Sequence, residues 1–430
     1  MTFVAVLRSL RFGIGLAALV VAANAGAADS LLATASSYID GFSPEGAVDG
    51  ERFSVETGSV WKGRRGESNW WWQVAFVQPR EVGAILQVAG DHEFVLRNAP
   101  RHYVWQGSRD GARWFDIDET FTHDERRLYR LHRFRQKRLV QFLRLKIDSV
   151  NGDAPALREV EFFASPKETI QFPEWIIAVN TTHERTLPNH GWEFIPLAKS
   201  CDGWVHLQAQ QVWLDSFDEA FLSAEPRPLC AFLSGNFKDW CEVEREPWRG
   251  VQEVLRKKNL PIWASCGGAQ GLAILAEYGV DRPWDCPHCR DPLHARTPIY
   301  THIGHTAARP CGDYSGCVFE RGPHWIAQTA ADPVFRGLPR EMQLIESHCG
   351  QIQWPPKGWT LIATAGQGTL TKMQCLRMRD RYIYAAQFHI EMAGAPQASR
   401  QIMANFLALA KTWGGYNPKG HAVPVPSLSR

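Results

Sequence analysis

The chain has 430 residues, of which 45% are apolar and 21% charged, as expected for a soluble globular protein of two or three domains. Its formal net charge is only +2, from 47 basic and 45 acidic residues, which argues against a general nucleic-acid-binding protein. The 35 Gly and 26 Pro follow no repeat, so neither a collagen-like chain nor a long disordered tract fits.

Residues 1–28 have the pattern of a secretory signal peptide. Arg8 and Arg11 precede an apolar run over residues 12–23, and small residues follow at Ala25 and Ala27. The run is shorter than the roughly 20 residues that span a bilayer. We therefore expect an exported protein, periplasmic or extracellular, with no transmembrane segment.

Residues 29–165 predict an all-β domain. Turn signals such as Asp49-Gly50 and Asp110-Gly111 separate short apolar or alternating runs, and no long helical period occurs. The expected strands are 70–76, 82–88, 102–106, 139–147 and 157–163. A jelly-roll sandwich is the natural architecture.

Residues 174–415 predict an α/β domain with a doubly wound sheet, joined by a linker at 166–173 and followed by a loose tail at 416–430. Short apolar runs suit buried parallel strands, and amphipathic stretches alternate with them. The strands are expected at 175–179, 229–233 and 261–264, and the helices at 248–258, 270–278 and within 392–413.

Cys266 stands at the sharpest motif of the chain, where an apolar strand is followed by Gly267, Gly268 and then a helix. A strand-to-helix turn holds a nucleophile out of the sheet edge, and the helix N-terminus favours the thiolate. The backbone N–H of Gly267 would point toward a developing oxyanion. The alternative is that Cys266 is a buried structural thiol or a disulfide partner.

A cysteine nucleophile needs a base and a group that orients the base. His389 follows a late strand-like run, and Glu391 lies two residues on, where it can hold the imidazole. Cys266, His389 and Glu391 therefore form a candidate catalytic triad.

These motifs resemble those of the class I glutamine amidotransferases. The G-x-C-x-G-x-Q pattern of that family matches at Cys266, Gly268 and Gln270, and its F-H-P-E pattern matches at His389 and Glu391. Leu233–Asn236 and Glu346–His348 also stand where the family has its oxyanion loop and the stretch ahead of the histidine. Two positions depart from the pattern, Ala264 in place of Gly and Ile390 in place of Pro.

The resemblance covers about residues 173–412 and implies a flavodoxin-like fold. It also implies that Cys266 attacks the side-chain amide of a glutamine-like or γ-glutamyl molecule or peptide, forming a thioester without any cofactor. His389 would protonate the leaving group and then activate water. The amides of Gly235 and Gly267 would stabilise the oxyanion, and Gln270 would seat the glutamyl group.

Four further cysteines lie close together in the sequence, at Cys286, Cys289, Cys311 and Cys317. A structural zinc site and disulfides are both open interpretations. A thioredoxin-like redox motif is disfavoured because Asp291-Pro292 follows the C-x-x-C directly.

The N-terminal half resembles the discoidin family, also called the F5/8 type C domain, with a galactose-binding-like jelly roll. The resemblance rests on A-V-D-G at Ala47–Gly50, the strand at Trp70–Val74 and the closing strand at Leu157–Phe162. It implies binding of a glycan, lipid head group or protein, and a structural Ca²⁺ near Asp49 and Glu161. The alternative is that Asp49 makes an Asx turn and Glu161 is a solvated strand residue.

Residues 126–146 carry nine Lys or Arg and no acidic residue, which permits an anionic ligand. The favoured alternative is a pair of strands whose basic outer faces are balanced by acidic residues elsewhere.

Taken together, the sequence predicts an exported amidohydrolase with a surface-binding module. Family members usually feed ammonia to a synthetase, but export and the lack of a G-x-x-x-x-G-K-[ST] loop favour plain hydrolysis. Two alternatives remain: an inactive domain serving as a scaffold, and a glutaminase subunit that supplies ammonia to a partner synthetase.

Overall fold

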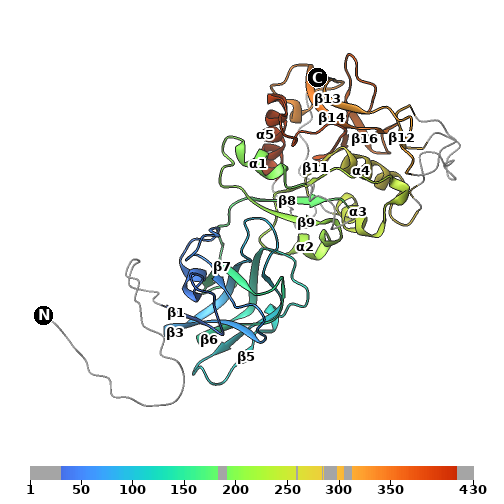
Figure 1. Cartoon of the computed structure of the whole chain (residues 1–430). Helices are drawn as coiled ribbons and strands as arrows, with labels where there is room; N and C mark the ends of the chain where they lie inside the picture. Colours follow the sequence, from blue (N-terminus) through green and yellow to red (C-terminus); the bar gives the residue numbers. More distant parts are fainter. Residues whose placement is uncertain are drawn as a thin grey trace, which may run out of the picture.

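The computed structural model describes residues 31–182, 191–257, 260–282, 284, 298–304 and 312–413. Within them the chain forms a β-sandwich followed by an α/β domain (Figure 1). The predicted signal peptide and C-terminal tail lie outside the described residues. No helix among the described residues is long and apolar enough to cross a membrane.

The β-sandwich contains one antiparallel sheet in the order β2-β7-β3-β6-β4-β5, with β1 paired to β3. Two strands are long and bent, because the pairing of β3 with β6 shifts register between Ala75 and Arg80 and again between Val82 and Ala84. The strands are β1 (Leu31–Ala35), β2 (Trp61–Lys62), β3 (Trp70–Ala89), β4 (Ala99–Ser108), β5 (Phe115–Asp116), β6 (Tyr129–Asn151) and β7 (Ala156–Phe163).

The prediction of separate strands at 70–76 and 82–88 was wrong, since both belong to β3. The alternating pattern breaks at the exposed residues 77–79, but the strand continues through a bend there. Before that break, alternation places Trp72, Val74 and Phe76 in the core of the sandwich.

The α/β domain contains a nine-stranded mixed sheet in the order β14-β13-β16-β17-β18-β11-β10-β8-β9. Strands β9, β8, β10, β11 and β18 are parallel, and β17, β16, β13 and β14 extend the sheet in antiparallel fashion. The strands are β8 (Trp175–Asn180), β9 (Gln208–Trp213), β10 (Cys230–Leu233), β11 (Ile262–Ser265), β13 (Glu320–Gln328), β14 (Glu341–His348), β16 (Trp359–Ala365), β17 (Cys375–Met378) and β18 (Ile383–Ala386), and β12 (Tyr300–His302) pairs with β15 (Gly350–Ile352) apart from this sheet.

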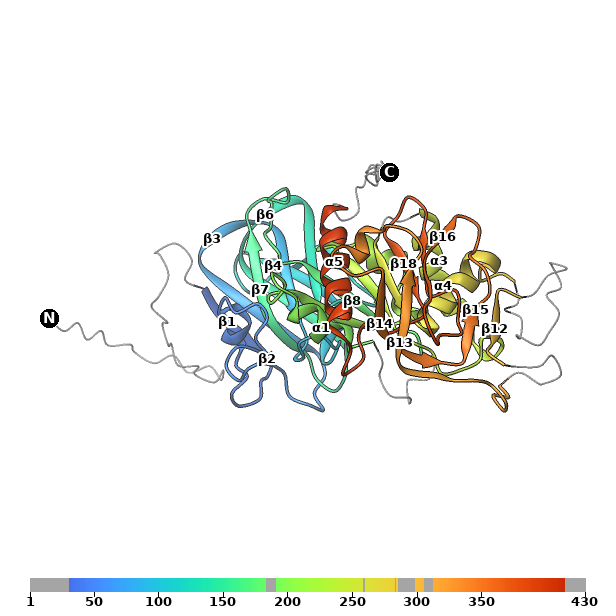
Figure 2. The same cartoon turned by 90° about the horizontal axis from the view of Figure 1, so that it is seen from above.

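Helices cover both faces of this sheet (Figure 2). Alternate residues of each buried strand enter opposite cores: Ile177 faces the core of α3 and α4, while Ile176 faces that of α1 and α5. The helices are α1 (Phe194–Ser200), α2 (Glu219–Ser223), α3 (Arg249–Lys257), α4 (Gly267–Tyr278) and α5 (Gln397–Thr412).

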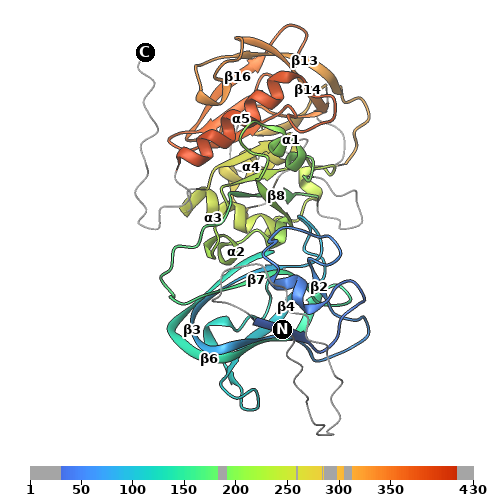
Figure 3. The same ribbon diagram turned by 90° about the vertical axis from the view of Figure 1, so that its left-hand side faces the viewer.

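The two domains share a hydrophobic core. Val88, Leu128 and Tyr129 of the sandwich belong to the same buried cluster as Trp175 and Phe221 of the α/β domain. Figure 3 shows the sandwich packed against the side of the α/β domain that carries α2, and Figure 1 shows β9 on that same side. The contact is therefore a packed interface and not a loose tether.

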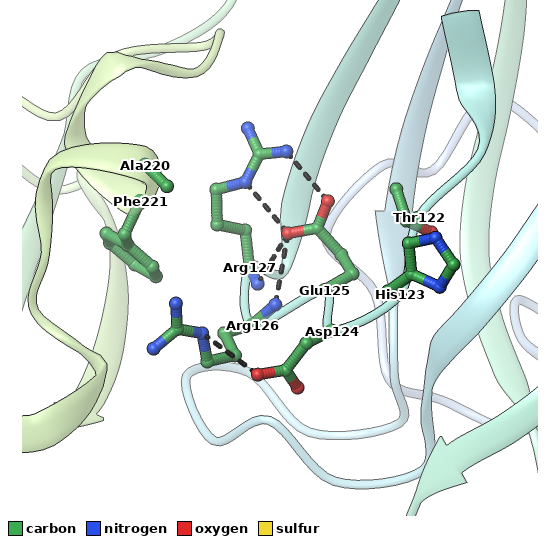
Figure 4. Close-up of a pocket in the computed structure, with 8 residues that line it drawn as sticks. All are labelled: Thr122, His123, Asp124, Glu125, Arg126, Arg127, Ala220 and Phe221. Atoms are coloured by element: carbon green, nitrogen blue, oxygen red, sulfur yellow. Dashed lines mark hydrogen bonds and ion pairs between the residues drawn. The ribbon is translucent and has the colours of Figure 1, made fainter. Parts of the chain in front are cut away.

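Backbone and side-chain hydrogen bonds reinforce this interface. The Tyr129 hydroxyl donates to the Ala209 carbonyl at 2.9 Å, and the N–H of Leu128 donates to Gln210 Oε1 at 2.8 Å. A cavity of about 190 Å³ lies between residues 122–127 and α2 (Figure 4). None of its lining residues belongs to the triad predicted from the sequence.

Candidate active site

Cys266 occupies the turn between β11 and α4, with backbone angles φ 48° and ψ −113°. A positive φ is costly for a residue with a side chain and persists only where the surroundings enforce it. Its N–H donates to the Ala386 carbonyl at 2.8 Å, which ties the turn to β18. Cys266 as a whole is 7% exposed.

Two glycines after Cys266 permit the close approach of the neighbouring β10 loop. A Cβ at Gly267 would lie 2.2 Å from the backbone nitrogen of Asn236, and one at Gly268 would lie 2.5 Å from the carbonyl oxygen of Ser234. The loop after β10 therefore packs directly on the start of α4.

His389 and Glu391 follow β18 and form an ion pair. Nδ1 of His389 lies 2.6 Å from Oε1 of Glu391, and Oε2 of Glu391 accepts the Ser265 hydroxyl at 2.9 Å. Trp263 Nε1 donates in turn to the Ser265 oxygen at 3.2 Å. The carboxylate is therefore held from both sides, and it holds the imidazole.

The electrostatic surroundings favour a protonated His389. Burial alone would lower its pKa, but the charge of Glu391 and the nearby Cys266 sulfur raise the pKa well above 6.5. Among the described residues, His389 Nε2 has no hydrogen-bond partner of normal geometry. This nitrogen is the one left to exchange protons with Cys266 and with a substrate.

The loop after β10 lies beside the imidazole. A Cβ at Gly235 would be 3.8 Å from His389 Cε1. The Thr181 hydroxyl donates to the Gly235 carbonyl at 2.7 Å, which fixes the orientation of this peptide. Gly235 and Gly267, the predicted oxyanion donors, therefore lie on adjoining segments around Cys266.

Gln270 lies on α4, one helical turn after Cys266. Its Nε2 donates to the Gly350 carbonyl at 3.0 Å, and its Oε1 accepts from Trp240 Nε1 at 3.1 Å. The side chain is thus bonded to Gly350 and Trp240, whereas the sequence prediction assigned it to the substrate.

No role in this site was predicted for Ser265, Thr181 or Ser347, although Ser347 lies within the stretch Glu346–His348 that resembles the family pattern. Ser347 contributes its carbonyl, which lies 3.7 Å from Cys266 Sγ. A polar residue at the end of a buried strand was a usable signal for Ser265 and Thr181. A backbone carbonyl leaves no signal in the sequence.

The predicted cysteine cluster falls mostly outside the described residues, which omit Cys286, Cys289 and Cys311. Cys317 is not part of a disulfide, whereas Cys241 is disulfide-bonded. Within the described part of the chain, no three His, Cys, Asp or Glu side chains are grouped so as to hold a metal ion.

The residues predicted to bind Ca²⁺ have other partners in the structure. Glu161 forms a two-point ion pair with Arg52, whose Nη2 lies 2.6 Å from Oε2, and Asp49 accepts the N–H of Glu51 at 2.8 Å. Arg52 also donates to the carbonyl of Gln171 at 2.7 Å. A guanidinium therefore occupies the position in which a cation was expected, so the residues present do not fit a bound Ca²⁺.

Five of the nine basic residues in the stretch at residues 126–146 form ion pairs. Two of these pairs cross the domain interface, Arg126 with Asp218 at 2.5 Å and Arg133 with Glu225 at 2.8 Å. Lys137 pairs with Glu81 at 2.6 Å within the sandwich. The acidic counterparts expected for a structural role of this stretch are present.

Residues 33–161 match the F5/8 type C domain family. The chain is also similar to glutamine-hydrolysing GMP synthases. It is 34% identical to the enzyme of Thermus thermophilus over 87 residues, which are 20% of this chain and 16% of that protein. It is 29% identical to the enzyme of Thermosipho melanesiensis over 179 residues, which are 40% of this chain and 32% of that protein. The matches thus span a third or less of these relatives.

Two solved structures are similar to separate parts of the chain. A Thermoplasma acidophilum protein assigned to GMP synthase has 21% identity and a TM-score of 0.41, covering 57% of this chain and 98% of that one. A pectin-binding carbohydrate-binding module has 18% identity and a TM-score of 0.27, covering 34% and 96%.

Proposed function

We propose that this protein is an exported amidohydrolase that cleaves a glutamine or γ-glutamyl amide through a thioester on Cys266. The observation that carries the proposal is the placement of Cys266, on a strained strand-to-helix turn, near enough to His389 to raise its pKa. His389 is in turn paired with Glu391, with Nδ1 2.6 Å from Oε1. The similarity to glutamine-hydrolysing synthases supports the same chemistry.

The proposed reaction has two steps, acylation of Cys266 and hydrolysis of the resulting thioester. The Cys266 thiolate attacks the amide carbonyl, the C–N bond breaks, and Nε2–H of His389 protonates the departing ammonia or amine. Water then attacks the thioester, with His389 as the base, and releases the carboxylic acid and Cys266. Glu391 stabilises the imidazolium that is present before the C–N bond breaks and that forms again when water attacks the thioester.

Two features support export and hydrolysis. The signal-like segment at residues 1–28 fits export, and the disulfide at Cys241 fits an oxidising compartment. Outside the cell or in the periplasm, an enzyme that simply hydrolyses the amide needs no nucleotide and no acceptor.

The β-sandwich is proposed to bind a surface ligand such as a glycan, supported by its F5/8 type C match. One end of the sandwich packs on the α/β domain, where the Phe94 carbonyl accepts the N–H of Gln211 at 2.7 Å. We therefore place the ligand at loops away from this interface. Binding of the intact protein to a glycan array tests this part.

The decisive test of the catalytic proposal is labelling with a diazo-ketone analogue of glutamine, followed by peptide mass mapping. We expect stoichiometric modification of Cys266, lost in Cys266→Ala and retained in the matched control Cys201→Ala. Hydrolysis of γ-glutamyl amides should be lost in the same variant. Labelling of Cys266 only after unfolding would contradict the proposal and favour an inactive scaffold.

A further inference from the structure

The backbone of residues 345–350 runs past the three parts of the proposed site. The Ile345 carbonyl accepts the N–H of His389 at 2.8 Å. The Ser347 carbonyl lies 3.7 Å from Cys266 Sγ. The carbonyl of the segment's last residue accepts Nε2 of Gln270 at 3.0 Å. This segment, here called the pocket wall, therefore touches the base, the nucleophile and the helix behind the nucleophile.

The buried side chain of His348 holds the C-terminal end of the pocket wall, at Gly350. Nδ1 of His348 lies 2.9 Å from the Gly350 carbonyl, and Nε2 lies 2.8 Å from Oε2 of Glu346. Because a carbonyl oxygen can only accept, Nδ1 must carry a proton. The contact with Glu346 is an ion pair without hydrogen-bond geometry. The His348 side chain is 2% exposed, so water does not compete for the hydrogen bond to Gly350.

A second carboxylate fixes the ring from the neighbouring strand. Oε2 of Glu320 lies 3.7 Å from His348 Nε2, and both side chains are 2% exposed. Glu320 is itself anchored, since it accepts the backbone N–H groups of Leu370 at 2.7 Å and Thr371 at 3.1 Å. The imidazole therefore has one orientation, set by groups outside the proposed triad.

We propose that His348 is a positioning residue for the reaction at Cys266. Its Nδ1–H fixes the Gly350 carbonyl, and through it the pocket wall against which the glutamyl part of a substrate is seated. This inference rests on the proposed function and adds to it the group that shapes the substrate pocket.

Two variants distinguish the role of Nδ1 from that of Nε2 in the His348 ring, because each keeps a polar group near only one of the two positions. In His348→Asn, the side-chain NH₂ takes the place of Nδ1–H and keeps the bond to Gly350. In His348→Gln, the polar group reaches instead toward the place of Nε2 and loses that bond. The readout is the labelling of Cys266 by the diazo-ketone, resolved into the half-saturating concentration and the maximal rate.

We expect His348→Gln to raise the half-saturating concentration about tenfold or more, because a wall displaced by a fraction of an ångström seats the substrate poorly. His348→Asn should stay within about threefold of the wild type, and the exposed control His206→Gln should not differ from it. Equal losses in both His348 variants, or none in either, would overturn the inference. Absence of labelling in the wild type would overturn the proposed function, and with it this inference.

A spectroscopic measurement on the wild-type protein does not depend on the folding of a variant. In ¹⁵N spectra of histidine-labelled protein, the His348 Nδ1–H should be visible and protected from exchange with solvent. An unprotonated Nδ1 at neutral pH would contradict the hydrogen bond to Gly350 and the role built on it.

Discussion

The imidazole of His389 lies 2.6 Å, through Nδ1, from Oε1 of Glu391, and the other oxygen of that carboxylate is bound to Ser265. The pair connects the end of β18 to the end of β11, two strands that run parallel in the sheet. The base is thus oriented by a group from its own loop, and that group is fixed by the strand carrying the nucleophile.

Replacing Glu391 should therefore change the pH dependence as well as the rate. In Glu391→Gln the charge that raises the pKa of His389 is removed, so that pKa falls. The alkaline limb of the labelling or hydrolysis profile, where His389 loses its proton, should move to lower pH. We expect the maximal rate to fall by about 10²- to 10⁴-fold.

The same pair makes a contribution to stability with a definite sign. A histidine whose pKa is raised on folding stabilises the native state fully below about pH 6.5, and this contribution is lost as the pH rises through the native value. The difference in melting temperature between wild type and Glu391→Gln should therefore be larger at pH 6 than at high pH. A difference that grows as the pH rises would contradict the raised pKa.

Glu159 offers an opposite test in the β-sandwich. Burial raises its pKa to about 8, opposed by the N–H of Gly50 and reinforced by the charges of Glu161 and Asp49. The neutral form is favoured in the native state, so its contribution to stability is full below about pH 4.5 and is lost as the pH rises through 8.

Glu159→Gln should stabilise the protein at pH 8, by about 2 kcal/mol, and leave its stability unchanged at pH 4. Glutamine can still accept the Gly50 N–H through its carbonyl oxygen. Thermal unfolding at the two pH values measures the effect, with the exposed Glu56→Gln as control. Destabilisation at pH 8 would show that the carboxylate is ionised in the native state.

Arg52 should make the sandwich independent of calcium. Neither added Ca²⁺ nor a chelator should change the melting temperature, because the guanidinium already neutralises Glu161. Arg52→Ala should cost about 1–3 kcal/mol, since it leaves a partly buried carboxylate without its partner. Arg65→Ala is the matched control, because Arg65 and Asp153 are both about 70% exposed. A wild-type protein stabilised by Ca²⁺ would contradict this prediction.

Tyr129 should link the unfolding of the two domains. Its ring lies in the shared core, and its hydroxyl donates to Ala209. Tyr129→Phe should cost about 1 kcal/mol, the usual value for one hydrogen bond. Tyr129→Ala should cost about 3–5 kcal/mol. Calorimetry should show a single transition in the wild type; two separated transitions would indicate that the domains are independent.

Local patterns predicted a large part of this architecture. Buried parallel strands such as β8 and β10 are short apolar runs, and the elbow at Cys266 is marked by its glycines, so these features could be read directly from the chain. The antiparallel half of the sheet was not predicted. Strands such as β13 carry Gly, Pro and charged residues, and their place depends on pairing with distant strands.

The candidate site likewise contains residues that a local sequence pattern marks and contacts that it does not. Cys266, His389 and Glu391 have reactive side chains at motif spacing, whereas the Ser347 carbonyl acts through the backbone. The residues at the predicted calcium site, Asp49 and Glu161, do not fit a bound Ca²⁺, because Glu161 is paired with Arg52. These two residues are 109 positions apart in the sequence. A pairing over that separation leaves no local pattern.

The shared core around Tyr129 and Trp175 also limits how such proteins can exchange domains during evolution. Domains joined only by a linker can be exchanged by recombination within that linker. Here a replacement sandwich domain would need apolar side chains that fit the surface around Trp175, since otherwise that apolar surface would be exposed to water. The unit that could be transplanted is therefore the pair of domains together, and the sandwich is a permanent part of this protein, not an interchangeable module.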